Sequence, residues 1–442
     1  EEKEVGPKSP LVPGSVGGWL TALETHGRLD RAAVFAPAIE YAEQGVPITL
    51  QNANFFRLAE PRLADGARAT FLPEGAVPVP GTVLKQPLLA ATFREIVAGG
   101  QEAFYQGEIG KRIVRDVADQ GGLLTEQDLA DFRPEWQTTV STAYRGYDIH
   151  TVPPPCSGFQ YLQTFNLLEP FDLRAMGQNS PDTIHVMAEA MKLATADRIA
   201  YAAQPDAPVA DLLSPMYADR RRALIDPGRA LVSEGERFGG AREGETVTAG
   251  RPGGLSRECT THFDVIDGDG NAVSVTQSIG AFFGSGVMAG DTGIMLNNFS
   301  YWFDLDPASP NVIAPRKKIE MCMAPAMVFN GDRLLLAIGT PGSFGILETT
   351  PQMISNVIDH GFSVQAAIEA PRFRTYEGTR LEIEGRVPEA TRAELIRRGH
   401  DVRVIDDWAP VVGGGQGIMI DPDSGALLGG ADPRRDGYAL GW

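Results

Sequence analysis

The chain has 442 residues, with 39 Lys and Arg against 57 Asp and Glu, and its formal net charge is therefore −18. Nucleic acids and anionic membrane surfaces bind basic proteins, so this balance argues against both as partners. Hydrophobic residues make up 43% and charged residues 22%, as in globular proteins, and no apolar run reaches the ~18 residues that span a bilayer.

Three cysteines cannot build a disulfide framework, and the six histidines show no metal-ligand spacing. We therefore expect neither a metal nor a cofactor. The first residues, Glu1 to Gly6, are neither a signal peptide nor an initiator methionine, so we expect the natural N-terminus to lie outside this sequence. The sequence does not fix the compartment: a cytoplasmic location is the default, and a periplasmic or secreted one stays open.

The first half of the chain is predicted to be mainly helical. Apolar residues recur at helical spacing in the stretches 31–44, 87–98, 108–120 and 182–201. Glycine ends the first two, at Gly45 and at Gly99-Gly100. A β-hairpin is expected over 137–152, with its turn near Arg145-Gly146. Residues 226–258, rich in Gly, Arg and Glu, are predicted to form an exposed mobile loop of the kind in which chains are cut.

The second half is predicted to begin with strands. They are expected over 260–267 and 272–278, joined by a turn at 268–271, then over 286–296, and on both sides of Asn330-Gly331-Asp332. Helices are expected over 347–360, 363–370 and 388–399, followed by a sheet segment from Val402. Strands flanked by helices in this order predict a layered α/β protein.

Several common motifs are absent. Asp267 to Asn271 begins like a calcium loop, but Ala272 stands where the loop needs glycine, so a hairpin turn is favoured. The glycine clusters at 284–286 and 413–417 lack the spacing of nucleotide-binding loops. No Gly-x-Ser-x-Gly elbow exists, which argues against an α/β-hydrolase.

Thr260 follows the predicted loop and opens a predicted strand. A cut before Thr260 would give this residue a free α-amine beside its own hydroxyl. The hydroxyl alone is a weak nucleophile, but an α-amine titrates near neutrality and can take its proton. One residue would then supply both nucleophile and base. Taken alone, two threonines at a strand start are better explained by β propensity, and only the wider sequence changes that balance.

The block from Thr260 to Thr276 resembles the start of the small subunit of gamma-glutamyltranspeptidases. Motifs similar to that family continue in the same order on both sides of it: Val12–Val16, Phe104–Gly107, Gly121–Leu123, Tyr144–Tyr147, Pro153–Gly158, Ala196–Arg198, Phe283–Gly286, Gly293–Asn298, Gly339–Gly342, Ala370–Phe373 and Ala431–Gly437. The resemblance covers nearly the whole chain, and it is specific because so many motifs keep their order.

This resemblance implies an N-terminal nucleophile (Ntn) hydrolase with a four-layer αββα sandwich, made as one inactive chain that cuts itself. The cut between Cys259 and Thr260 would separate a helix-rich large-subunit segment, residues 1–259, ending in the mobile loop, from a small-subunit segment, residues 260–442. Thr260 would attack an amide carbonyl, form an acyl-enzyme and pass the acyl group to water or an amine.

The resemblance also implies roles for three further residues. Ser278 matches a second hydroxyl that the family hydrogen-bonds to the nucleophile. Gly342 matches the first glycine of an oxyanion loop, whose backbone N–H groups would hold developing negative charge. Ser343 replaces the second glycine of that loop, which preserves a backbone donor if serine adopts the local dihedral angles.

The implied acyl pocket departs from the family pattern. Phe299 and Trp302 stand where the family has a Gln and an Asp, and Met321-Cys322 replaces a serine pair. A pocket without polar partners should reject an α-amino acid head group, because buried unpaired polar groups are costly. The sequence therefore leaves open a gamma-glutamyl hydrolase or transferase and a non-glutamyl acylase or amidohydrolase. The latter would be similar to the cephalosporin acylases, the oxamate amidohydrolases or the biosynthetic-pathway homologues of the superfamily.

The expected partners are a small-molecule amide, a water or amine acceptor, and the two fragments of the chain. An unprocessed, non-catalytic binding protein is the third alternative. His262 lies in the strand that begins at Thr260, so a structural hydrogen bond is its expected role. Cys322 is expected to be a small buried residue rather than a nucleophile.

Overall fold

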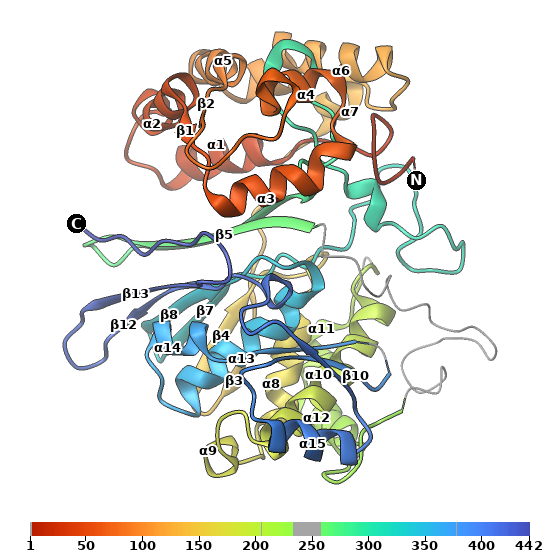
Figure 1. Cartoon of the computed structure of the whole chain (residues 1–442), viewed down its shortest axis with the longest axis vertical. Helices are drawn as coiled ribbons and strands as arrows, with labels where there is room; N and C mark the ends of the chain where they lie inside the picture. The colour runs from red at the N-terminus through yellow and green to blue at the C-terminus, as the bar shows by residue number, and fades with distance from the viewer. Residues whose placement is uncertain (1, 205, 233–257, 377) are drawn as a thin grey trace. The chain divides into compact units, whose positions relative to one another are not determined.

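The computed structural model describes residues 2–204, 206–232, 258–376 and 378–442, so most of the predicted loop 226–258 lies outside the described residues. The chain divides into two compact units, each assembled from separate stretches (Figure 1). The first unit contains residues 1–136, 257–260 and 277–304, and the second contains 137–256, 261–276 and 305–442. Among the described residues, no helix combines the length and apolar character needed to cross a membrane.

The first unit is mainly helical. Its elements are α1 (Ser15–His26), α2 (Arg31–Gln44), α3 (Leu50–Ala59), α4 (Asp65–Phe71), α5 (Pro87–Tyr105), α6 (Glu108–Asp119), α7 (Glu126–Asp131) and the short antiparallel pair β1 (Val46–Pro47) and β2 (Val83–Leu84). Apolar side chains of α1, α2, α5, α6 and α7 form one core with Val287, Ala289 and Leu296, and those of α3 and α4 form a second core with Met288. The segment after residue 277 is therefore an integral part of this unit, held by apolar burial.

One sequence prediction in this unit is confirmed and one is wrong. The predicted helix 87–98 does end at Gly99-Gly100, because Gly100, with φ 62° and ψ −149°, leaves helical geometry, and the last residues of α5 form a separate short helical segment beyond this break. The predicted strand 286–296, in contrast, is not a strand. Its apolar residues fill the core, while glycines at positive φ, Gly290 and Gly293, turn the chain and leave one isolated bridge.

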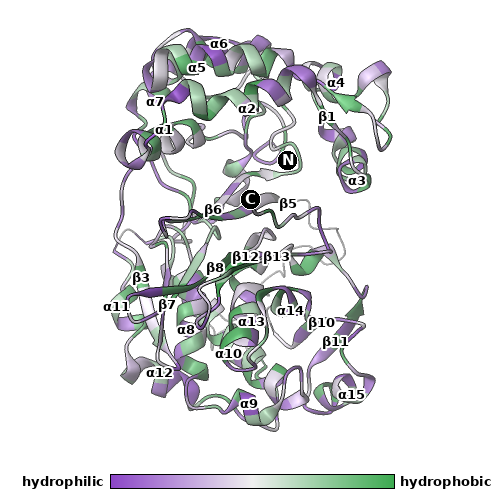
Figure 2. Ribbon diagram, turned by 90° about the vertical axis from the view of Figure 1, so that its left-hand side faces the viewer, coloured by the Kyte–Doolittle hydropathy of each residue, from purple (hydrophilic) through white to green (hydrophobic). Residues whose placement is uncertain are grey.

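The second unit is built on a six-stranded sheet of order β13-β12-β8-β7-β4-β3. Its strands are β3 (Val140–Tyr144), β4 (Tyr147–Thr151), β7 (Ala326–Asn330), β8 (Arg333–Gly339), β12 (Gln416–Ile420) and β13 (Leu427–Ala431). Each strand of this sheet is antiparallel to its neighbours, and the apolar run of β8 appears green in Figure 2. The predicted hairpins around residues 145 and 331 are thereby confirmed.

One face of this sheet is covered by helices that lie together in both views (Figures 1 and 2). The helices of the unit are α8 (Phe159–Leu168), α9 (Leu173–Met176), α10 (Pro181–Tyr201), α11 (Val209–Leu212), α12 (Pro215–Arg222), α13 (Ile346–Ile358), α14 (Val364–Glu369) and α15 (Glu389–Arg397). Helices α8, α13 and α14 contact the sheet, and α10 packs on α8. A three-stranded sheet of order β11-β10-β9 completes the unit, from β9 (Phe373–Thr375), β10 (Arg380–Glu384) and β11 (Asp401–Ile405).

The strands β5 (Glu258–Ile266) and β6 (Ala272–Ala281) pair with each other, as predicted. His262 of β5 is buried and hydrogen-bonds Thr276 Oγ1 at 2.8 Å and Asp264 Oδ2 at 3.0 Å. A Cβ added to Gly339 of β8 would lie 2.4 Å from the His262 ring. This part of β5 therefore packs against the six-stranded sheet, and His262 has the structural hydrogen bonds that the sequence predicts.

The implied large- and small-subunit segments are interleaved within each unit. In the second unit, β4 from the first segment pairs with β7 from the second, with Ile149 opposite Val328. In the first unit, the core combines helices of residues 1–136 with side chains of the segment 287–296. A cut between residues 259 and 260 would leave both sets of contacts in place.

Two buried histidines connect helix α10 to the stretch that precedes residue 233. His185 Nε2 lies 2.8 Å from the carbonyl oxygen of Asp226, so this nitrogen must donate. His185 Nδ1 is then an acceptor for His400 Nε2–H, also at 2.8 Å. Burial, with Lys192 adding to it, lowers the pKa of His400 to about 3, and burial lowers the pKa of His185 as well. Both rings are therefore neutral at neutral pH.

This pair predicts acid sensitivity. An unfolded histidine binds a proton near pH 6.5 and folded His400 does so only near pH 3, so its contribution to stability is complete above pH 6.5 and is lost between pH 6.5 and about 3. The loss from His400 between pH 7 and 4.5 should be about 2–3 kcal/mol. We expect His400→Gln to flatten this slope in denaturant unfolding at the two pH values. The exposed His26→Gln serves as control, and equal slopes for both variants would refute the assignment.

Candidate active site

The candidate nucleophile and its predicted partner are brought together by the pairing of β5 with β6. Thr260 Oγ1 donates a hydrogen bond to Ser278 Oγ at 3.1 Å, although the two residues are 18 positions apart. Ser278 Oγ also accepts the Gly280 backbone N–H at 2.9 Å. The Thr260 side chain is partly buried. Two donors on one oxygen fix the Ser278 rotamer and, through it, the orientation of the Thr260 hydroxyl.

The end of β6 is fixed by an asparagine that the sequence analysis did not single out for a role. Asn298 is fully buried, accepts the Ala281 N–H at 2.9 Å and donates to the Glu4 carbonyl oxygen at 2.9 Å. Gly280 has φ 93°, and a Cβ there would lie 2.0 Å from Asn298 Oδ1. Glycine is thus required at position 280. The Asn-Asn motif of the sequence therefore orients the strand that carries Ser278.

The two aromatic residues of the implied acyl pocket lie on one short 3₁₀ turn, Phe299–Trp302, directly after Asn298. Phe299 is buried, Trp302 is partly buried, and their ring centroids lie 6.5 Å apart in an edge-on arrangement. The Phe299 backbone N–H donates to Asn297 Oδ1 at 3.1 Å. Thr260, Ser278, Phe299 and Trp302 all belong to the first compact unit.

The other predicted site residues belong to the second unit. Met321 forms an isolated parallel bridge with the predicted Pro-Cys-Ser motif: its N–H donates to Pro155 O at 2.9 Å, and its carbonyl accepts Ser157 N–H at 2.7 Å. Cys322 is 3% exposed, as expected for a small buried residue. Burial raises the pKa of the nearby Cys156 thiol to about 12, which makes it a poor nucleophile.

The predicted oxyanion loop connects β8 to α13. Gly342 has φ 139°, which glycine alone tolerates well, and Ser343 has φ 56°, a left-handed conformation that is rare for serine. Serine therefore does adopt the dihedral angles of a glycine position. The 3₁₀ turn Ser343–Gly345 leads directly into α13, and N–H groups at such a helical start favour negative charge.

Two large-subunit motifs meet beside this loop. Glu320 Oε1 accepts Ser157 Oγ–H at 2.9 Å and Arg198 Nη1–H at 2.6 Å. The Arg198 guanidinium also stacks over the ring of Phe344, 3.9 Å from its centroid. The residue after Ser343 and the residue before Met321 are thus held by the same arginine. Sequence spacing could not reveal this contact, because the three residues are far apart in the chain.

One cluster of potential metal ligands lies in the described part of the chain: His185, Glu189 and His400. The sequence analysis missed it, because it searched for local spacing only. Both carboxylate oxygens of the cluster already have donors, since Glu189 Oε1 accepts from Lys192 Nζ at 2.6 Å and Oε2 accepts from Leu231 N–H at 2.8 Å. A cation here would have to compete with the Lys192 ammonium, so the arrangement favours a structural hydrogen-bond network.

The family model for gamma-glutamyltranspeptidase matches residues 1–442. The "Acylase ACY 1 proenzyme" of Pseudomonas sp. (strain V22) is 41% identical over 99% of this chain and 76% of its own length. The "Glutathione hydrolase proenzyme" of Escherichia coli (strain K12) is 33% identical over 96% of this chain and 73% of its own length. The crystal structure of cephalosporin acylase from Bacillus halodurans has a TM-score of 0.88 at 33% identity, covering 100% of this chain and 80% of that one.

The fold and these matches define an amidohydrolase of the Ntn-hydrolase class. The chain belongs to the gamma-glutamyltranspeptidase family. Its fold class is accordingly the αββα sandwich that the sequence resemblance implies. The relatives named above include both an acylase and a glutathione hydrolase, so both enzymatic alternatives of the sequence analysis fall within the family.

The backbone geometry at Ser343 predicts that Ser343→Gly keeps its activity. The proposed donor is a main-chain N–H, and glycine removes the cost of the left-handed conformation, about 1–2 kcal/mol, partly offset by the greater entropy of the unfolded chain. We expect an unchanged or slightly higher Tm and kcat within about threefold of wild type, since no oxyanion donor is lost. A fall in kcat of nearly 100-fold, as for a removed oxyanion donor, would instead indicate that the Ser343 hydroxyl is the donor.

Proposed function

We propose that this chain is a proenzyme cut between Cys259 and Thr260, and that Thr260 is then the catalytic nucleophile. The observation that carries the proposal is the hydrogen bond between Thr260 Oγ1 and Ser278 Oγ, the two residues that the sequence resemblance implies as the nucleophile and its hydroxyl partner. In this proposal, residues 1–259 and 260–442 are the large and small fragments. The β4–β7 pairing and the shared apolar core hold them together.

The proposed reaction is acyl transfer through an ester on Thr260. The Thr260 hydroxyl adds to the amide carbonyl carbon while its proton passes to the α-amine of the same residue. The backbone N–H groups of Gly342 and Ser343 stabilise the negative oxygen of the tetrahedral intermediate. The carbon–nitrogen bond then breaks and the departing amine takes the proton. Water or a second amine attacks the ester and restores the Thr260 hydroxyl.

We further propose that the preferred acyl group lacks an α-amino acid head. Phe299 and Trp302 offer aromatic surface, and Met321 and Cys322 offer apolar side chains, at positions where the family pattern has polar groups. The higher identity to an acylase than to the Escherichia coli glutathione hydrolase supports the same choice. A gamma-glutamyl hydrolase or transferase is the second candidate, supported by the family match over the whole chain.

Self-processing predicts a defined mass pattern. Wild-type protein should yield two fragments on denaturing electrophoresis, the smaller beginning Thr-Thr-His-Phe by N-terminal sequencing, and Thr260→Ala should remain one chain without turnover. Thr260→Ser should keep both reactions at a reduced rate, because it retains a hydroxyl. A wild-type chain that stays uncut would support a non-catalytic binding protein. Turnover by Thr260→Ala would refute the nucleophile.

The acyl preference predicts the order of three anilides with the same leaving group. Glutaryl 4-nitroanilide differs from γ-glutamyl 4-nitroanilide only in lacking the α-amino group, and butyryl 4-nitroanilide lacks the terminal carboxylate as well. We expect kcat/KM for one of the two amine-free substrates to exceed that for the γ-glutamyl compound by at least about 10-fold. This is the effect expected when a substrate buries one polar group without a hydrogen-bond partner. The reverse order would establish the gamma-glutamyl alternative.

A further inference from the structure

Strands β8 and β13 end, and strand β12 begins, at the same side of the six-stranded sheet. The strand register places Gln416 of β12 opposite both Gly339 of β8 and Ala431 of β13. The residue after Gly339, the residue before Gln416 and the residue after Ala431 are Thr340, Gly415 and Asp432. The oxyanion loop, the glycine-rich loop 413–415 and the start of the Asp-Pro-Arg-Arg motif therefore emerge together.

The oxyanion loop holds a strained backbone. Gly342 and the non-glycine Ser343 both have positive φ, and a residue in such a conformation persists only where its surroundings fix it. Ser343 costs about 1–2 kcal/mol in this region. The contacts that impose this shape should thus be found in the residues packed around the loop.

The first such contact is made by Thr340. Its hydroxyl is fully buried, donates to Pro341 O at 2.8 Å and accepts the Gly414 N–H at 2.9 Å. A Cβ on Gly413 would lie 2.3 Å from Thr340 Oγ1 and 3.0 Å from Pro341 O. The glycine-rich loop therefore lies directly against the oxyanion loop, at a distance that admits no side chain.

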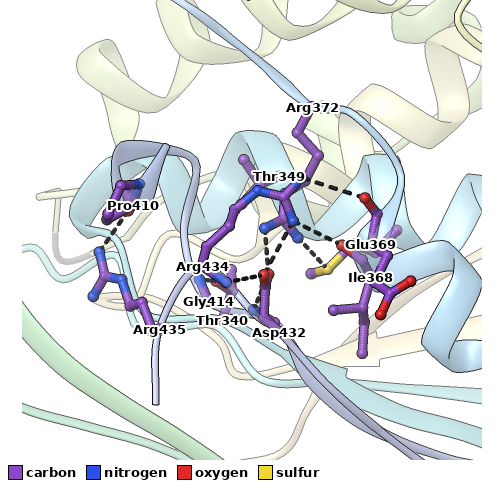
Figure 3. A network of polar contacts seen from close by, with 12 residues as sticks. Thr340, Thr349, Ile368, Glu369, Arg372, Pro410, Gly414, Asp432, Arg434 and Arg435 are labelled. Carbon is purple, nitrogen blue, oxygen red and sulfur yellow. Dashed lines mark hydrogen bonds and ion pairs between the residues drawn. The ribbon is translucent and has the colours of Figure 1, made fainter. Parts of the chain in front are cut away.

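The glycine-rich loop is in turn fixed by Asp432. The Gly415 N–H donates to Asp432 Oδ2 at 2.8 Å. Arg372 Nη2 donates to the same oxygen, and Arg434 Nη1 donates to Oδ1 at 3.0 Å. All three charged side chains are buried. Figure 3 shows both guanidinium groups pointing at the Asp432 carboxylate, beside Gly414 and Thr340.

Charge balance explains why the carboxylate stays ionised there. Burial alone would raise the pKa of Asp432, but the two guanidinium groups outweigh burial and hold it below the usual value. Arg434 is shared with Glu384, to which it donates from Nε at 2.7 Å and from Nη2 at 2.6 Å. Glu384 also accepts from Arg386 Nη2 at 2.9 Å. Two acids and three arginines thus form a network with fixed geometry, and a shift at Asp432 would leave Arg372 without its carboxylate.

We propose that Asp432 is a positioning residue for the oxyanion loop. It acts through Gly415 and Gly414 on Thr340, and through Thr340 on the backbone of Gly342 and Ser343. The inference rests on the proposed function, because it takes those two residues as the oxyanion donors. Asp432 and Thr340 do not touch the substrate. Their effect is to hold N–H groups in place, so it should appear in kcat and not in KM.

The test compares two pairs of variants in processed enzyme, with the best of the three anilides as substrate. Asp432→Asn removes the charge that holds Gly415, and Asp359→Asn is its matched control. Asp359 is also buried and accepts from Tyr144 OH at 2.8 Å and from Arg145 Nε at 3.0 Å. Thr340→Val removes the hydroxyl that holds Gly414. Ser355→Ala is its control, because Ser355 Oγ donates to Asp359 at 2.7 Å near the far end of α13.

We expect Asp432→Asn and Thr340→Val to lower kcat by about 10–100-fold with KM within about threefold, as for a misplaced catalytic group. Thr340→Ser should restore most of the kcat, because it keeps the hydroxyl. The two controls should lower Tm but keep kcat within about threefold. If Asp432→Asn does not mature, Thr340→Val and Thr340→Ser carry the test.

A wild-type kcat in Thr340→Val would overturn the proposal, as would equal kcat losses in the variants and their controls. Failure of the proposed function has a different signature, which is turnover by Thr260→Ala. A fully active Thr340→Val together with an inactive Thr260→Ala would thus refute the positioning role alone.

Discussion

The pairing register of β8, β12 and β13 is the constraint on which the second unit depends. Because Gly339, Gln416 and Ala431 are aligned, three loops leave the sheet at one edge. A shift of one residue in any strand would exchange its buried and exposed faces and would separate the loops. The apolar covering of helices α8, α13 and α14 specifies this register, since it fixes which side chains face inward. The packing that fixes the register of the sheet therefore also fixes the position of the oxyanion loop.

The buried ionic network at that edge is not explained by stability. Removing charges from water costs free energy that their attraction often only offsets, and apolar replacements of similar shape are commonly as stable. What the network of Asp432, Glu384, Arg372, Arg434 and Arg386 provides is a single arrangement. Ser343 in the loop has a left-handed conformation, which persists only if its surroundings allow a single arrangement. The network therefore matters for the conformation of the loop more than for the stability of the fold.

The sequence was informative where physics is local or where motifs keep their order. Helix α2 ends at Gly45 and the hairpin turns at Gly146, because these glycines adopt dihedral angles that other residues avoid. The same reasoning located the break at Gly100, where the backbone leaves helical geometry. Sequence pattern failed over 286–296, where apolar residues fill a helical core instead of a sheet.

Motif order predicted the partnership of Thr260 with Ser278, but local spacing could not predict contacts between distant segments. The meeting of Arg198 with Glu320 and Phe344, and of His185 with His400, depends on tertiary packing that no window of sequence contains. The glycines at 413–415 looked like an ordinary turn, yet one of them is glycine because a threonine oxygen occupies the space of its side chain.

The interleaving of the two segments has a consequence for reversibility. The chain folds as a single molecule, in which β4 finds β7 at the high effective concentration that a covalent connection provides. Once the connection between residues 259 and 260 is gone, the same pairing becomes an association between two molecules. A small fragment separated from the large one would expose the side of β7 that β4 covers, and an exposed strand edge invites aggregation. The uncut chain could refold after unfolding, but the two fragments would not readily reassemble. The lifetime of the mature enzyme would then depend on its rate of unfolding.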